Sequence, residues 1–189
     1  MKTLKLLTLG SLFIALTSCS SDDDHPEHVH EEEVITTIVA TLTPQGGGTD
    51  VTLTSRDIDG GGPGEPVITI SGDLGANTTY NGAITLSNET EDPAEDITAE
   101  VYEEGAEHQF FFTSEIGTVA YDDTDENGDP IGLEFTLTTI DNSTTGNFTI
   151  ILRHEPNKDG TGVSDGDITN ANGETDLEVT FEDIDVIDE

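Results

Sequence analysis

Apolar and polar residues alternate with a period of two along most of this chain, a pattern that predicts β-strands. The expected strands are short, and segments rich in Gly, Pro, Asn and Asp separate them. Their ranges are 34–42, 51–54, 67–70, 79–86, 109–112, 118–121, 133–137, 148–152 and 177–181. About nine short strands, each with one apolar face, favour a mainly β fold, an antiparallel β-sandwich or barrel.

One segment has the helical period instead. Asp92 is a candidate N-cap, Pro93 suits the first helical position, and Glu95 lies three residues after the cap. Apolar or aromatic residues then recur at helical spacing as far as Gly105, namely Ala94, Ile97, Val101 and Tyr102. We therefore expect one short helix. The longest expected loop covers residues 154–174, and loops of that length are usually functional or mobile.

The N-terminal residues carry a targeting pattern. Lys2 and Lys5 precede an apolar run over residues 6–16, and small residues then lead into Cys19, the one cysteine of the chain. These features are typical of a secretory signal, and the run is shorter than the about 20 residues of a membrane-spanning helix. A signal that ends at a cysteine resembles the lipobox of bacterial lipoproteins. The resemblance implies that residues 1–18 are removed and that Cys19 is acylated; the alternative is a conventional signal followed by an unmodified thiol.

Ser20, Ser21 and three aspartates, residues 22–24, follow the cysteine directly. This run resembles the surface-export signal of Bacteroidota lipoproteins, which implies a lipid-anchored protein at the outer membrane that faces the cell exterior. A solvated spacer is the alternative. We interpret residues 19–32 as an acidic, histidine-containing tether and residues 33–189 as a single β domain.

Four segments of the mature chain resemble a group of small lipoproteins from the same bacteria. They are residues 32–37 (EEVITT), 107–110 (EHQF), 130–133 (PIGL) and 152–154 (LRH). The resemblance covers nearly all of the mature chain and implies no activity. Members are often labelled as the type 1 periplasmic binding fold superfamily. That fold requires alternating strands and helices over a longer chain, whereas the pattern here predicts one helix at most.

Charge narrows the possible partners. The sequence has 41 acidic and five basic residues, a formal net charge of −36, and only 32% hydrophobic residues. Nucleic acid is excluded as a partner, because Lys and Arg supply most of the affinity for phosphates. The composition is also found in disordered chains, but the regular strand spacing indicates a folded domain. A bound cation would offset the carboxylates.

The segment 123–134 matches the calcium-loop pattern D-x-[DN]-x-[DN]-G-x5-E. In such loops, oxygen ligands at alternate positions converge on Ca²⁺, and a glycine permits the sharp turn. Since strands flank this segment, we expect a Ca²⁺ site in a strand-to-strand connection, with Asp123, Asp125, Asn127, Asp129 and Glu134 as candidate ligands. The alternative is an acidic turn at Asn127-Gly128 without metal. Asp57 and Asp59 begin a second, incomplete version of the pattern.

The histidines suggest a different ion. His25, His28 and His30 lie beside Glu27 and Glu31, and such ligands suit Zn²⁺ or Cu²⁺. A charged spacer is the alternative. We expect His108 and His154 to be packed residues or residues at strand edges and not metal ligands.

No nucleophile elbow or free thiol is recognisable, so we do not expect an enzyme. The sequence favours a surface-exposed, lipid-anchored binding or structural lipoprotein with a Ca²⁺-stabilised β domain. The alternative is an accessory lipoprotein that captures a transition metal, or a metal-bearing ligand, for an outer-membrane receptor.

Overall fold

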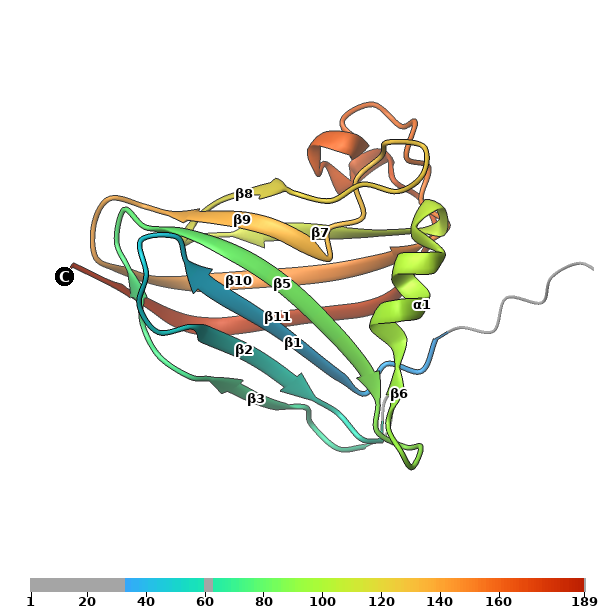
Figure 1. Cartoon of the computed structure of the whole chain (residues 1–189), viewed down its shortest axis with the longest axis horizontal. Helices are drawn as coiled ribbons and strands as arrows, with labels where there is room; N and C mark the ends of the chain where they lie inside the picture. The colour runs from blue at the N-terminus through green and yellow to red at the C-terminus, as the bar shows by residue number, and fades with distance from the viewer. Residues whose placement is uncertain (1–32, 60–62, 189) are drawn as a thin grey trace, which may run out of the picture. The chain divides into compact units, whose positions relative to one another are not determined.

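The computed structural model describes residues 33–59 and 63–188 (Figure 1). These residues form eleven strands, one α-helix and three short 3₁₀ helices. The elements are β1 (Thr37–Pro44), β2 (Val51–Arg56), β3 (Val67–Ile70), β4 (Leu74–Gly75), β5 (Thr79–Asn88), β6 (Glu95–Asp96), α1 (Ile97–Glu103), η1 (Gly105–Glu107), β7 (His108–Ser114), β8 (Gly117–Tyr121), β9 (Glu134–Thr139), β10 (Thr144–His154), η2 (Val163–Asp165), η3 (Ile168–Asn170) and β11 (Glu174–Ile187).

The strands form two sheets that pack face to face (Figure 1). The larger sheet has the order β3-β2-β1-β5-β9-β8, with β6 beside β5, and the smaller has the order β4-β11-β10-β7. Every pairing is antiparallel except that of β11 with β4. The expected mainly β fold with one short helix is confirmed. The expected strands correspond to the described strands of four or more residues, whereas the two-residue strands β4 and β6 were not expected.

The hydrophobic core lies between the inner faces of the two sheets. Alternation places Phe148, Ile150 and Leu152 of β10 on one inner face, and all three are 0% exposed. Phe112 of β7 stacks on Phe148, with ring centroids 5.9 Å apart and an angle of 5° between the planes. Apolar burial of this kind is the main favourable contribution to folding, and it holds the two sheets together.

The helix begins later than the sequence pattern indicated. The N-cap is Asp96, whose side chain accepts a hydrogen bond from the Thr98 amide at 3.1 Å. Asp92 is not the cap, because the chain after it remains non-helical and Glu95 and Asp96 first pair with β5. Ile97 and Val101 are buried, so α1 covers one end of the sandwich (Figure 1). Within the described residues, no helix is long and apolar enough to cross a bilayer.

The long loop, residues 155–173, covers the outer face of the smaller sheet. Val163 and Ala171 are buried against Phe111 of β7, and the buried Gln109 side chain donates to the Val163 carbonyl at 2.8 Å. Gly173 has φ +69°, and a Cβ there would lie 2.2 Å from the His154 carbonyl oxygen. Only glycine permits such a close approach. Gly173 therefore allows the end of the loop to pass directly beside the end of β10.

The side of the sandwich formed by β11 and β3 is less covered than the outer face of the smaller sheet. β11 pairs with β10 along one side, but on its other side only Val186 and Ile187 pair, with β4. β3 is the last strand of the larger sheet. A groove lies between β3 and β11, and it runs past residues of the site described next.

Candidate metal centre

Two histidines meet on the inner face of the smaller sheet. His108 is the first residue of β7, His154 is the last residue of β10, and the antiparallel register places them directly opposite one another. Opposite residues on one face of an antiparallel pair are neighbours. The two ring centroids are 4.8 Å apart with an angle of 59° between the planes. His108 is 0% exposed and His154 8%.

A β-bulge adds Asp176 to this pair. Leu152 of β10 pairs with Leu177 of β11, whereas the next residue, Arg153, pairs with Thr175, so Asp176 is the extra residue. A bulge of this type changes the direction of a side chain relative to the normal alternation. The Asp176 side chain is 2% exposed, and its Oδ2 lies 3.8 Å from His108 Nε2 and 3.8 Å from His154 Nδ1.

Glu33 completes the group from the segment that leads into β1. Its Oε1 lies 3.1 Å from His108 Nε2, and its Oε2 lies 3.5 Å from His154 Nδ1. The side chain is 7% exposed. Two imidazoles and two carboxylates, three from the smaller sheet and one from the segment before β1, therefore offer ligand atoms that all lie within 4.8 Å of one another.

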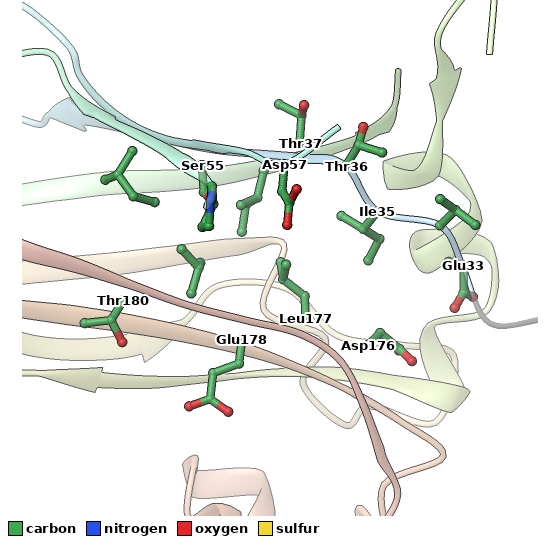
Figure 2. Close-up of a pocket in the computed structure, with 15 residues that line it drawn as sticks. Glu33, Ile35, Thr36, Thr37, Ser55, Asp57, Asp176, Leu177, Glu178 and Thr180 are labelled. Atoms are coloured by element: carbon green, nitrogen blue, oxygen red, sulfur yellow. The ribbon is translucent and has the colours of Figure 1, made fainter. Parts of the chain in front are cut away.

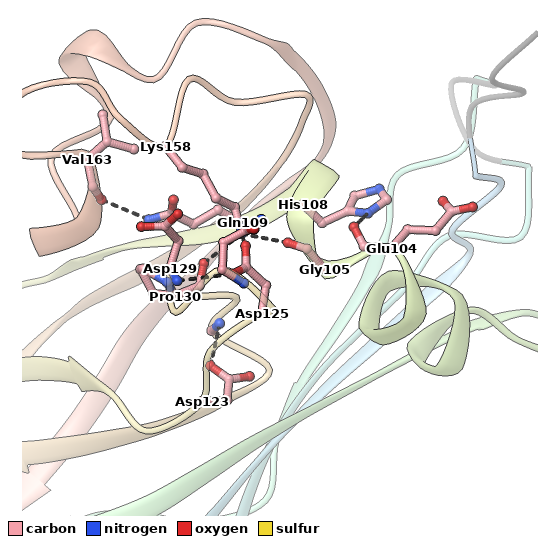
Figure 3. Close-up of polar contacts among 12 residues, drawn as sticks. Glu104, Gly105, His108, Gln109, Asp123, Asp125, Asp129, Pro130, Lys158 and Val163 are labelled. Atoms are coloured by element: carbon pink, nitrogen blue, oxygen red, sulfur yellow. Dashed lines mark hydrogen bonds and ion pairs between the residues drawn. The ribbon is translucent and has the colours of Figure 1, made fainter. Parts of the chain in front are cut away.

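The tautomer of His108 follows from a neighbouring carbonyl. His108 Nδ1 lies 3.2 Å from the carbonyl oxygen of Glu104, at the end of α1 (Figure 3). A carbonyl oxygen can only accept, so Nδ1 carries the hydrogen and donates it. In the neutral ring, Nε2 therefore presents a lone pair toward Glu33 and Asp176. His108 Nε2 and Glu33 Oε2 are both buried and without a hydrogen-bond partner.

Burial lowers the pKa of His108, and the nearby His154 ring lowers it further, although Glu33 and the Glu104 carbonyl act in the opposite direction. The neutral ring is thus favoured. A lone pair that faces carboxylate oxygens is repulsive unless a cation lies between them. The arrangement fits a metal ligand whose second nitrogen is oriented by a carbonyl, a common outer-shell interaction of ligating histidines.

More acids surround the group. The pKa of Glu100 on α1 is raised, first by burial and then by the charges of Glu95, Glu33, Glu104 and Asp96. Glu107 and Glu155 each offer a carboxylate oxygen within 4.8 Å of a ring nitrogen of His154. The local potential is therefore negative and attracts cations.

The distances suit a small tetrahedral ion. With bonds of about 2.0–2.1 Å to nitrogen and oxygen, a tetrahedral Zn²⁺ separates its ligand atoms by about 3.3 Å. The four nitrogen–oxygen distances in the group, 3.1 to 3.8 Å, lie around that value. Calcium prefers six to eight oxygen ligands, so a site with two imidazoles disfavours it.

The expected calcium ligands are arranged differently. Both oxygens of Asp123 accept from backbone amides. Oδ1 accepts from Gly132 at 2.7 Å (Figure 3), and Oδ2 accepts from Glu134 at 3.0 Å. Asp125 Oδ1 accepts from the amides of Asn127 and Asp129. Within the described residues, the carboxylates of this loop form no group of three convergent ligand atoms.

Lys158 supplies the cation that contacts this loop. Its ammonium donates to Asp125 Oδ2 at 2.9 Å, to the Pro130 carbonyl at 3.0 Å and to the Gly105 carbonyl at 2.6 Å. These contacts use all three donors of the ammonium. The side chains of Lys158 and Asp125 are 7% and 1% exposed. The lysine thus joins the long loop, the acidic loop and the end of α1.

The remaining candidates from the sequence do not join either group. Asp59 accepts a hydrogen bond from the Gly64 amide at 3.1 Å, and Asp57 lines the groove between β3 and β11. Cys19, His25, His28 and His30 lie outside the described residues. Sequence analysis expected His108 and His154 to be packed residues or residues at strand edges and not ligands. Both are buried at strand ends, but their convergence with Glu33 and Asp176 in a possible ligand group was missed. No protein-family model, curated protein or solved structure matches the chain.

The Lys158→Met substitution tests the role of the ammonium. It keeps an apolar stem but leaves the Asp125 carboxylate buried without its cation, so we expect the free energy of unfolding to fall by about 3–5 kcal/mol. Urea denaturation measures this change. Adding Asp125→Asn, which keeps an oxygen for the two backbone amides, should recover part of the loss. Unchanged stability in Lys158→Met would contradict this role.

The same contacts predict a response to acid. Burial alone would raise the pKa of Asp125, but the hydrogen bonds from Lys158, Asp129 and Asn127 hold it below the ordinary value of 3.8. A lowered carboxyl pKa contributes stability that is complete above the unfolded pKa and is lost as the pH falls through the folded pKa. The difference in unfolding free energy between the wild type and Asp125→Asn should therefore shrink between about pH 5 and about pH 2. A constant difference would contradict this expectation.

Proposed function

We propose that this protein is a lipid-anchored lipoprotein of the outer membrane whose β-sandwich binds a divalent transition-metal ion of the Zn²⁺ class. Glu33, His108, His154 and Asp176 are the ligands. The observation that carries the proposal is the buried His108 Nε2, which faces two carboxylates and has no hydrogen-bond partner, while Glu104 holds the other ring nitrogen.

The ligand types support an ion of this class. Two imidazoles and two carboxylates, without any thiolate, suit Zn²⁺ and its neighbours Co²⁺ and Ni²⁺ and do not favour Cu(I). The negative potential of the chain, with 41 acidic residues against five basic ones, raises the local concentration of cations. A binding protein that captures such an ion on the cell surface, for a receptor in the same membrane, is consistent with both features.

Metal binding is measured by isothermal titration of the chelator-treated mature protein with ZnCl₂. We expect one ion per chain and a higher melting temperature, since an ion at 100 times its Kd stabilises the folded state by about 2.7 kcal/mol. His108→Ala and His154→Ala should weaken binding beyond the about 10–100-fold typical of an outer-shell change. Asp123→Asn, in the acidic loop, is the matched control and should bind as the wild type does. Equal affinity in all four proteins would refute the site.

Calcium binding by the 123–134 loop is the competing hypothesis, and the contact of Asp125 with Lys158 weighs against it. With both oxygens of Asp123 and Asp125 already hydrogen-bonded, we expect about 1 mM CaCl₂, a concentration that fills many extracellular sites, to leave the melting temperature unchanged. A calcium-dependent rise that the double variant Asp123→Ala/Asp125→Ala abolishes would restore the calcium site.

The anchor is tested separately. In a bacterium that makes lipoproteins, the intact mass should correspond to residues 19–189 with acyl chains on Cys19, and the protein should partition into detergent. Cys19→Ser should abolish both properties, because a thiol is the acceptor in this class of modification. An unacylated wild-type N-terminus would exclude the lipid anchor without affecting the metal site.

A further inference from the structure

The groove between the two sheets borders the edge of strand β11. It has a volume of about 550 Å³ and lies between β11 and the β1–β3 part of the larger sheet (Figure 2). Five consecutive residues of β11, 176–180, line it. Because neighbouring side chains of a strand point to opposite faces, a consecutive run means that the backbone edge itself lies along the groove. Figure 2 shows Leu177 directed into the groove and Glu178 directed to the outer face of the smaller sheet.

This edge of β11 has no partner strand over residues 177–180. Within the described residues, β11 pairs with β10 along one side and with β4 at Val186 and Ile187 alone. In an antiparallel pair, every second residue directs its N–H and C=O away from the partner strand. Alternate residues of 177–180 therefore present both backbone groups to the groove. An edge of this kind is a template for pairing with another chain.

β11 lacks most of the features that usually protect an exposed edge. Such edges are commonly short, or they carry lysine, proline or a bulge. β11 has 14 residues, none of which is lysine or proline. Its register with β10 is regular from Leu177 to Phe181, and the bulges lie outside this stretch. The charged side chains of β11 are all acidic, so they disfavour an acidic strand but not a basic one.

The lining of the groove is acidic and partly apolar. Its acidic residues are Glu33, Asp57, Asp176 and Glu178. The lining residues, all in the described part of the chain, include no lysine, arginine or histidine. Val34 and Ile68, which also line the groove, are 54% and 39% exposed. The groove therefore complements a chain with both basic and apolar side chains.

We propose that β11 accepts an extended segment of a partner protein as an additional strand in this groove, and that basic and apolar residues alternate in this segment. Its backbone pairs with residues 177–180, in the manner of β-strand addition. Its apolar side chains continue the inner row of Leu177 and Val179, and its basic side chains lie beside Glu178 on the outer face. This interaction goes beyond metal binding and does not require an ion in the centre.

Charge disfavours a second copy of the chain as the occupant. The sequence has a formal net charge of −36. A two-fold symmetric pairing of two β11 edges would bring the acidic residues of both copies together. Like charges on opposite strands are destabilising. A basic segment is attracted by the same carboxylates.

Peptide binding tests the groove. The probe is a fluorescent heptapeptide in which lysine and valine alternate, and its anisotropy with the full mature chain in detergent gives the Kd. We expect Glu178→Lys to raise the Kd by at least about tenfold, because it replaces attraction beside the added strand by repulsion. Glu182→Lys makes the same charge change at another exposed position of β11, outside the groove, and should leave the Kd close to the wild-type value.

Modified peptides separate strand pairing from charge attraction. Methylation of every second backbone nitrogen keeps the charges but removes the donors along one edge of the peptide. Of the two possible methylation patterns, at least one should raise the Kd by at least about tenfold. With the unmodified peptide, hydrogen exchange measured by NMR should slow at alternate amides of residues 177–180, since pairing protects them.

The remaining outcomes contradict the proposal. Equal Kd values for Glu178→Lys and Glu182→Lys, or binding that neither methylation pattern weakens, would reduce the interaction to general attraction by an acidic chain. Absence of binding by the alternating peptide would overturn strand addition. A dimer in sedimentation, with slow exchange at residues 177–180 before peptide is added, would make a second copy the occupant. Failure to bind ZnCl₂ would remove the proposed function and leave these results unaffected.

Discussion

The site depends on the register between β7 and β10. This pairing places His108 opposite His154 and directs both side chains to the inner face, in line with Phe110 and Leu152. A shift of β7 by one residue would turn the His108 ring to the outer face of the sheet, away from His154, because side chains alternate along a strand. The apolar residues of β7 favour the observed register, since the same shift would move Phe110 and Phe112 out of the core. Core packing and the position of the two candidate histidine ligands therefore have the same cause.

The negative charges of the buried carboxylates are compensated in two different ways. Asp125 receives two backbone amides and the Lys158 ammonium, so its charge is compensated within the protein. Glu33 and Asp176 instead face imidazole nitrogens, and burial keeps the His108 ring neutral. Burying a charge is costly unless it is paired. The first arrangement is complete without a ligand, whereas the second becomes favourable when a cation joins it.

The strands and their buried faces could be predicted because alternation is a local property. The start of α1 could not, because Asp96 rather than Asp92 caps it after a short pairing with β5. The spacing in 123–134 matched a calcium loop, but spacing does not reveal that Lys158, from another loop, reaches Asp125. The candidate metal centre was missed for a similar reason. β8 and β9 separate its histidines in sequence, and a bulge directs Asp176 inward, so both features depend on register.

Glu33 is also the residue at which the predicted tether meets the folded body. With an ion bound, Glu33 would be cross-linked to β7, β10 and β11, four residues before β1 begins. If the chain is anchored through Cys19 as proposed, a pull on the anchor would reach the coordination bonds first, ahead of the hydrogen bonds between β1 and its neighbours. Occupancy by metal would then decide which part of the protein bears that load.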